Sequence, residues 1–155
     1  MLTLNQIVQR IKAICEAHEQ INTFVFGDID DKLRQDIVYP AVFMPYPTNN
    51  YQSVDKLLQC NLFIMDRLII GGSVTDNTYN ELEVTSDMTS VAEDLFAQFA
   101  YQKYTPNWNV QRNFNIIPLN ETDPDYLAGV QLAFTIKLPY IADRCQVPTT
   151  YTYGS

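Results

Sequence analysis

Apolar residues recur at three- and four-residue steps near the start of the chain. The stripe begins at Leu4 and continues through Ile11, which predicts an amphipathic α-helix over about residues 3–20. Thr3 and Gln6 have the spacing of a capping box, in which each side chain accepts a hydrogen bond from the other residue's backbone N–H. The sequence therefore predicts that the chain opens with a helix that buries one face.

A second helical stripe occupies the middle of the chain and predicts a helix over about residues 80–102. Thr78 and Glu81 have the spacing of a capping box at its start, and Pro106 marks its end. The preceding segment 71–77 is rich in Gly, Ser, Asp and Asn, which predicts a flexible loop.

Strict alternation of apolar and polar residues marks the last third of the chain. It predicts two long half-buried strands, at about residues 108–116 and 130–140. The acidic loop 119–126 joins them, so we expect an antiparallel hairpin. Arg112 interrupts the apolar face of the first of these strands.

Three further strands are predicted between the two helices, at about residues 23–27, 37–44 and 56–67. Pro40 places the second of them at a sheet edge or a bulge, because proline cannot donate a ladder hydrogen bond. Prolines and asparagines in residues 45–50 predict a break in regular structure.

These elements predict an α+β domain with a mostly antiparallel sheet of about five strands and two main helices packed on one face. The predicted order is α-β-β-β-α-β-β. Residues 1–141 form the single domain, and residues 142–155 are an extended C-terminal segment, either a frayed tail or an arm that orders against a neighbouring subunit. If it is an inter-subunit arm, the residues expected to make its contacts are Val147, Pro148, Tyr151 and Tyr153.

The charge balance argues against nucleic-acid recognition. Of 155 residues, 10 are Lys or Arg and 18 are Asp or Glu, so the net charge is 10 − 18 = −8, and no window clusters cations. Such a chain repels phosphates instead of releasing their counterions. It is compatible with a channel that DNA passes through without binding. No stretch approaches the ~20 apolar residues of a membrane span, and we expect no secretory leader and no membrane contact.

A search for catalytic or metal-binding residues finds no constellation, and we predict no enzyme activity, no metal and no cofactor. His18 is the single histidine, and the three cysteines are scattered, which favours reduced buried thiols. Asp28, Asp30 and Asp31 begin like a calcium loop, but Leu33 stands where such a loop needs glycine.

Besides the two predicted helices, four segments are distinctive: the proline-bracketed VYPAVFMP at 38–45, DYLAGVQL at 125–132, KLPY at 137–140 and CQVP at 145–148. Taken together, these features resemble the tail-terminator and neck-ring (tail completion) proteins of the head–tail neck of tailed bacteriophages. The KLPY and CQVP segments are similar to proteins of crAss-like phages that infect Bacteroides.

The resemblance implies a virion structural protein, made in the cytoplasm of the host bacterium, that forms a six- or twelvefold ring between portal and tail. Its partners would be copies of itself, the portal and adjacent neck or tail proteins, with DNA passing through without sequence-specific binding. On this basis we expect five loop residues to line the channel or contact a stacked ring. They are Asp76, Asn77, Glu121, Asp123 and Asp125.

Two other functions stay open at the level of sequence. One is a regulatory or adaptor module that acts as a homodimer. The other is an α+β domain that binds a small molecule in a concave site with convergent polar groups. Subunit stoichiometry separates the adaptor from the ring, because a dimer has two subunits and a ring has six or twelve.

Overall fold

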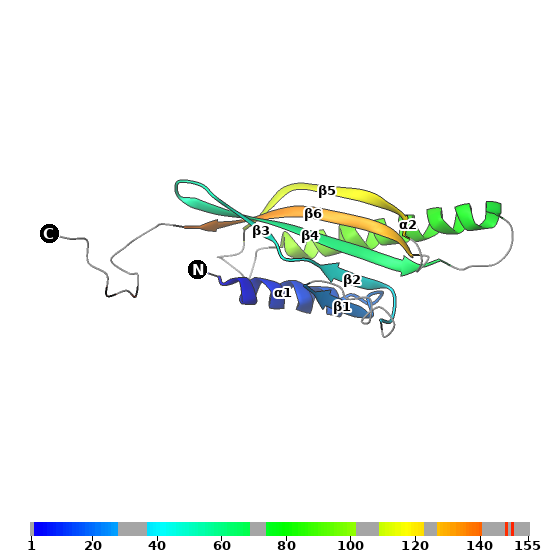
Figure 1. Cartoon of the computed structure of the whole chain (residues 1–155), viewed down its shortest axis with the longest axis horizontal. Helices are drawn as coiled ribbons and strands as arrows, with labels where there is room; N and C mark the ends of the chain where they lie inside the picture. The colour runs from blue at the N-terminus through cyan, green and yellow to red at the C-terminus, as the bar shows by residue number, and fades with distance from the viewer. Residues whose placement is uncertain are drawn as a thin grey trace.

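The protein is described from a computed structural model, which covers residues 2–27, 37–68, 74–101, 109–122, 127–140, 148 and 150. The α+β class is confirmed, with two helices and a mixed sheet of six strands (Figure 1). In chain order the elements are α1 (Leu4–Ala17), β1 (Thr23–Phe26), β2 (Ala41–Met44), β3 (Thr48–Tyr51), β4 (Asp55–Arg67), α2 (Val74–Phe99), β5 (Asn109–Thr122) and β6 (Leu127–Pro139).

The sheet is built around the two long strands β4 and β6, which pair along their whole length. Its order is β1-β2-β4-β6-β5, and β3 pairs with β4 beside the first part of that strand. The β1–β2 pair is parallel, whereas β2–β4, β3–β4, β4–β6 and β5–β6 are antiparallel. Among the described residues, β1 and β5 are therefore the two outermost strands of the path.

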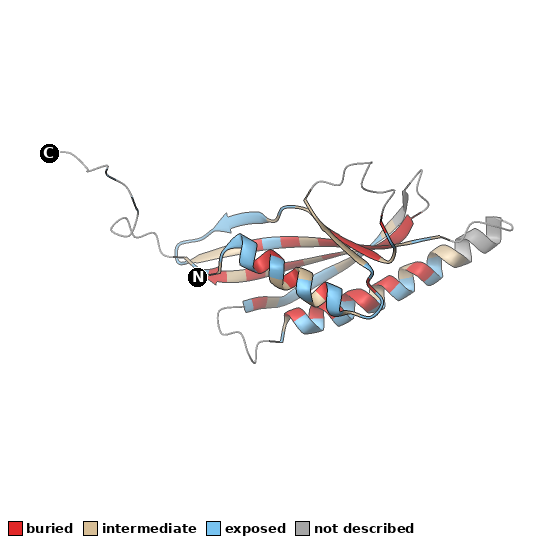
Figure 2. Ribbon diagram, turned by 90° about the horizontal axis from the view of Figure 1, so that it is seen from below, coloured by how far each residue is buried: buried red, intermediate tan, exposed pale blue. Residues whose placement is uncertain are grey.

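Both helices cover the same face of the sheet and bury one large apolar core against it (Figure 2). From α1 the core takes residues spaced three and four apart, such as Ile7 and Ile11, and from β4 it takes every second residue from Leu58 to Ile64. Stacked phenylalanine rings pack α2 against the β5–β6 hairpin. Phe99 of α2 stacks on Phe134 of β6 at 5.1 Å between ring centroids. These are the helical and strand periods expected for elements buried on one side.

The opposite face of the sheet carries a smaller apolar cluster, to which Ala41 and Phe43 of β2 contribute, together with Met65 and Leu127. Ile37, just before β2, completes it. Toward the start of β4 this face becomes polar and half-exposed. We refer to it below as the open face, because neither helix covers it.

Several predicted elements are confirmed. The helix start at Thr3 carries the full capping box with Gln6, in which the Gln6 N–H donates to Thr3 Oγ1 at 3.2 Å and the Thr3 N–H donates to Gln6 Oε1 at 2.9 Å. The strand beginning at Thr23, the long strand ending at Arg67 and the antiparallel pairing of the last two strands are also as predicted.

Other predictions were wrong in ways that share a cause. Residues 48–51 form β3, although the prolines at 45 and 47 and the asparagines at 49 and 50 suggested a break, so there are six strands and the order gains one β. The second helix begins at Val74, which places Thr78 and Glu81 inside it and converts the end of the predicted 71–77 loop into helix. Pairing and helix propagation overrode weak local propensity at these positions.

The predicted strand at 37–44 is strand only over β2, and its first four residues lie outside it. β5 continues to Thr122, so Glu121 belongs to a strand and not to the predicted loop. β5 also loses its register between Val110 and Phe114, which places Arg112 in an irregular stretch that does not pair regularly with β6. The sequence had marked Arg112 as an interruption of the alternating pattern.

The end of the last strand is tied to the β3–β4 hairpin. The Tyr140 N–H donates to the Val54 carbonyl at 2.9 Å, and the Tyr140 ring meets the Tyr51 ring edge-to-face at 5.0 Å. Lys137 Nζ lies 3.4 Å from Asp55 Oδ2. Of the predicted C-terminal arm, Pro148 and Thr150 are described and both are exposed; Val147, Tyr151 and Tyr153 lie outside the described residues.

Candidate assembly surfaces

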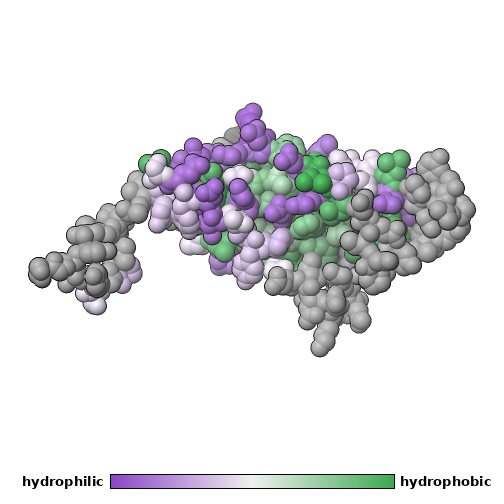
Figure 3. Space-filling view, turned by 45° about the horizontal axis from the view of Figure 1, so that its top comes forward, coloured by the Kyte–Doolittle hydropathy of each residue, from purple (hydrophilic) through white to green (hydrophobic). Residues whose placement is uncertain are grey.

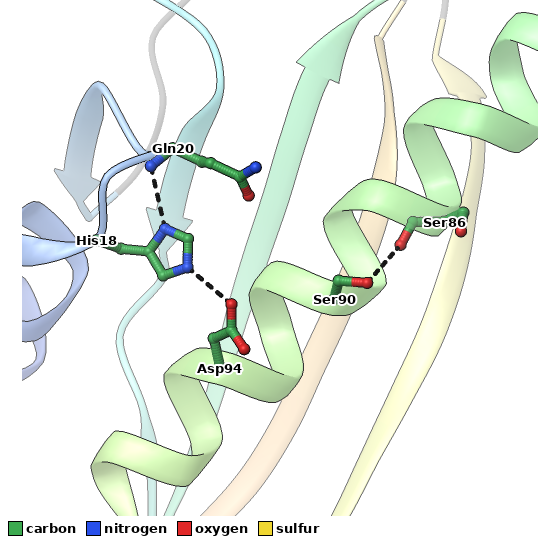
Figure 4. Close-up of polar contacts among 5 residues, drawn as sticks. All are labelled: His18, Gln20, Ser86, Ser90 and Asp94. Atoms are coloured by element: carbon green, nitrogen blue, oxygen red, sulfur yellow. Dashed lines mark hydrogen bonds and ion pairs between the residues drawn. The ribbon is translucent and has the colours of Figure 1, made fainter.

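His18 connects the two helices and has both ring nitrogens engaged (Figure 4). It is the C-cap residue of α1, its Nε2 lies 3.0 Å from Asp94 Oδ2 on α2, and the backbone N–H of Gln20 donates to its Nδ1 at 3.1 Å. The hydroxyl of Ser90, one turn along α2, instead donates to the Ser86 carbonyl at 3.3 Å. The arrangement therefore holds helix ends together and offers no activated nucleophile, which would need a base within hydrogen-bond reach.

A hollow of about 840 Å³ lies beside His18 between the two helices. Its charged groups are already engaged with each other or lie at its exposed rim, and alanines line much of the rest. The lining residues are Ala13, Ile14, Ala17, His18, Glu19, Gln20, Asp94, Leu95, Ala97 and Gln98. This is a helix–helix groove, and it lacks the convergent unpaired polar groups of a small-molecule site.

No group of three or more His, Cys, Asp or Glu side chains in the described part of the chain is placed to hold a metal ion. Within that same part, neither helix is long and apolar enough to cross a membrane.

Cys15 and Cys60 are buried free thiols, as the sequence predicted. Burial raises the pKa of each to about 12, and the nearby Glu16 carboxylate adds to the rise at Cys15. A thiol must ionise to act as a nucleophile, so both are unreactive in the folded state. We expect a Cys145→Ser variant to show no reaction with Ellman's reagent at pH 8 when native and two reactive thiols when unfolded in guanidinium chloride. Rapid labelling of the native variant would contradict this burial.

The open face is lined by neutral amides. The Gln131 Nε2 donates to Asn61 Oδ1 at 3.0 Å and so joins β6 to β4 across this face. A hollow of about 610 Å³ adjoins the irregular part of β5. Its polar lining is Gln59, Asn61, Gln111, Arg112, Asn113, Asn115 and Thr135. Figure 3 shows this side obliquely, with hydrophilic residues gathered toward the β3–β4 hairpin and a hydrophobic area farther along.

The β5 edge exposes apolar side chains. Ile117 is 47% exposed and Phe114 is 37% exposed, and Phe114 also stacks on Phe96 of α2 at 3.8 Å between centroids. Residues 113–120 carry no charge. Proteins that stay monomeric commonly protect long edge strands with lysines, bulges or prolines. β5 has Pro118 and two irregular stretches, at 110–114 and 119–122, but no lysine, so the regular part between them is open to pairing.

A second apolar surface lies at the opposite end of the sheet, between α1 and β1. It is a groove of about 340 Å³ that includes Leu4, Phe24, Phe26 and Tyr46. Tyr46 is 67% exposed and its ring meets Phe26 edge-to-face at 4.7 Å.

The segment that forms α2 is acidic. Residues 74–99 contain six carboxylates and no Lys or Arg. Glu83, Asp87 and Glu93 are exposed and make no ion pair within the described residues. Among the side chains that the structure describes, these three carboxylates give the exposed side of α2 a negative field, while Arg10 and Lys12 lie on the neighbouring α1.

The carboxylate of Asp66, at the end of β4, lies in this negative field. Burial raises its pKa, the hydrogen bond from the Arg67 N–H lowers it, and Asp87 raises it again, for a net rise. A raised folded-state pKa means that stability falls as pH rises through it. We expect Asp66→Asn to melt at a higher temperature than wild type at pH 7, with the difference disappearing below about pH 4, where the aspartate is protonated in both states. Glu93→Gln is the surface control; an unchanged pH 7 melting point for Asp66→Asn would contradict the prediction.

The residues predicted to line a channel lie only partly within the described structure. Asp76 and Asn77 lie in the first turns of α2, whose beginning extends past the sheet (Figure 1). Glu121 lies near the end of β5, at the same end of the molecule. Asp123 and Asp125 fall outside the described residues. The acidic face of α2 was not singled out, although the absence of Lys and Arg from that segment is visible in the sequence.

The chain matches no protein-family model and no curated protein.

Proposed function

We propose that this chain is a structural subunit of the head–tail neck of a tailed bacteriophage and that it assembles as a homo-oligomeric ring between portal and tail. The observation that carries the proposal is the acidic, cation-free outer face of α2, a helix of 26 residues that runs along the long axis of the molecule (Figure 1). A ring of such helices would surround DNA with negative charge.

The physical basis is the repulsion between like charges across a water-filled channel. DNA carries one negative charge per ~1.7 Å of helix axis, and a protein binds it by neutralising phosphates with cations. Phosphates are instead repelled by the exposed carboxylates of Glu83, Asp87 and Glu93. A wall built from this face would keep DNA moving and would not read its sequence.

The remaining surface also suits an assembly subunit. The open face bears several neutral amides, with Arg112 and the Lys137–Asp55 pair as charged groups, and both outer strands of the sheet have exposed apolar side chains beside them. Neutral amides and isolated apolar side chains lose little solvation free energy on burial compared with charges. The extended segment 142–155 would add an inter-subunit arm, with Pro148 exposed at its described position.

The first experiment is light scattering after size exclusion, together with negative-stain imaging of the same fractions. Rings of six or twelve subunits are the expected result. If the chain elutes as a monomer, mixing it with the portal of the same virion is expected to produce the ring. A compact dimer that forms no ring with the portal would overturn the proposal and favour the homodimeric adaptor.

A second experiment tests the channel wall on the assembled ring. Asp87→Lys combined with Glu83→Lys is expected to leave the ring intact and to create salt-sensitive retention of duplex DNA, which the wild-type ring lacks. The matched control is Lys substitution at Gln52 and Ser53, two residues of the exposed β3–β4 turn. Equal DNA retention by both variants would contradict the assignment of α2 to the channel.

A further inference from the structure

We infer that neighbouring copies join by pairing β5 of one copy with β1 of the next, so that the sheet continues across the subunit boundary. This inference rests on the proposed ring function and identifies the partner of each sheet edge as a second copy of this chain. It concerns two surfaces that the acidic face of α2 does not include.

The first support is strand polarity. β5 is antiparallel to β6, β6 to β4 and β4 to β2, while β2 is parallel to β1. Following these pairings across the sheet, β1 and β5 run in opposite directions. A rotation about an axis along the strands preserves strand direction, so the next copy presents β1 antiparallel to β5. Antiparallel pairing is the more stable arrangement, and repeating the rotation closes a ring with a heterologous interface.

The second support is the side on which the apolar side chains lie. Phe114 lies on the helix-covered side, where it stacks on Phe96, and Phe24 and Phe26 also pack against the helix-covered core. Ile117 is paired with Gln131 and lies on the open face, where Val25 of β1 packs against the small cluster. Continuing the sheet therefore brings aromatic side chains together on one face and aliphatic side chains together on the other.

The third support is the absence of repulsion. Neither β1 nor residues 113–120 of β5 carries a charged side chain, so the two edges meet without like-charge contact or desolvation of an unpaired ion. The groove of about 340 Å³ beside β1 offers the neighbour's exposed Phe114 the apolar side chains of Leu4, Phe24 and Phe26. Asn5, Gln9 and Lys12 form the polar part of the same groove, and Lys12 is already paired with Glu16 at 3.9 Å. Strand addition of this kind draws its affinity from main-chain hydrogen bonds and its specificity from side-chain contacts.

The test uses two variants of the full chain, each of which blocks one surface. Ile117→Lys places a charge on the exposed open-face side of β5. Leu4→Lys combined with Tyr46→Lys places charges on the groove beside β1. Val54→Lys, at an exposed position (59%) in the β3–β4 turn, is the control. Thermal melts followed by circular dichroism verify that each variant folds.

Sedimentation velocity is run on the preparation that forms rings, whether the chain alone or the chain mixed with portal. We expect the control to assemble as wild type does and each blocked variant to lose ring-sized species. An equimolar mixture of the two blocked variants is expected to form a heterodimer and no ring, because each copy keeps one intact surface. That result is incompatible with an interface in which β5 pairs with β5.

Ring formation by either blocked variant would overturn the edge pairing and leave the ring function standing. A mixture that stays monomeric would likewise overturn it, because the two intact surfaces would then fail to bind each other. Failure of the wild-type chain to assemble, alone and with portal, is a different outcome that would sink the proposed function itself.

Discussion

Gly129→Ala is expected to destabilise the folded protein by about 3 kcal/mol or more, a large part of the roughly 5–15 kcal/mol by which a typical domain is stable. Gly129 lies in β6 opposite Met65 of β4, at the centre of the sheet. A Cβ there would collide with the carbonyl oxygen of Ile64 and lie 2.8 Å from the Met65 Cα. Both are backbone atoms of a paired strand, so relief requires the two central strands to separate.

Gly27→Ala is the matched control, since it adds the same methyl group at a position with space around it. There the nearest atom to a new Cβ, on the Tyr46 ring, is 3.9 Å away, but φ is +96°, a backbone conformation that disfavours alanine. The expected cost is the backbone strain alone, about 1–2 kcal/mol. Urea unfolding of both variants measures the difference. A smaller loss at Gly129 than at Gly27 would contradict the close approach of β4 and β6.

Phe99→Ala is expected to cost about 3–5 kcal/mol of unfolding free energy. Phe99 is the last residue of α2 and is fully buried, and its ring stacks on Phe134 of β6. Removing the Phe99 ring leaves a cavity among the stacked phenylalanine rings that pack the end of α2 against the β5–β6 hairpin. Phe99→Leu retains most of the volume and is expected to lose substantially less.

The neighbouring Gln98 supplies the control, because its side chain is exposed on the same helical turn. Gln98→Ala should change the unfolding free energy by no more than about 0.5 kcal/mol. Denaturant unfolding of the three variants gives the ranking. If Phe99→Ala unfolded like Gln98→Ala, the end of α2 would not be anchored as described, and the placement of the acidic face along the sheet would fail with it.

Predictions from sequence succeeded where one element's pattern is decisive by itself. The spacing of Thr3 and Gln6 specified a capping box because the hydrogen bonds are local. The alternating residues of β4 and β6 specified long strands because each strand buries one face. The scattered cysteines at 15 and 60 suggested buried thiols, and burial in the core is what the structure shows.

Predictions failed where a distant strand or helix decides the outcome. Asn49 and Asn50, at the centre of the exposed strand β3, have little strand propensity, yet they form a strand because β4 supplies the pairing edge. The sequence predicted a loop at residues 74–77. In the structure these residues are helical, because they continue the helix that α2 forms by burying one of its faces. The clash at Gly129 has no signature in the residues around it, since it arises from the approach of β4.

The same division applies to the candidate surfaces. Sequence pattern and composition were sufficient for the α+β class, the first helix, the long strands and the net negative charge, because each depends on neighbouring residues or on simple counts. Tertiary structure decided that β1 and β5 form opposite edges with opposed directions and that Phe114 and Ile117 are left exposed. It also decided that both nitrogens of His18 are engaged. These features depend on residues far apart in the chain, and it is their packing that brings them together.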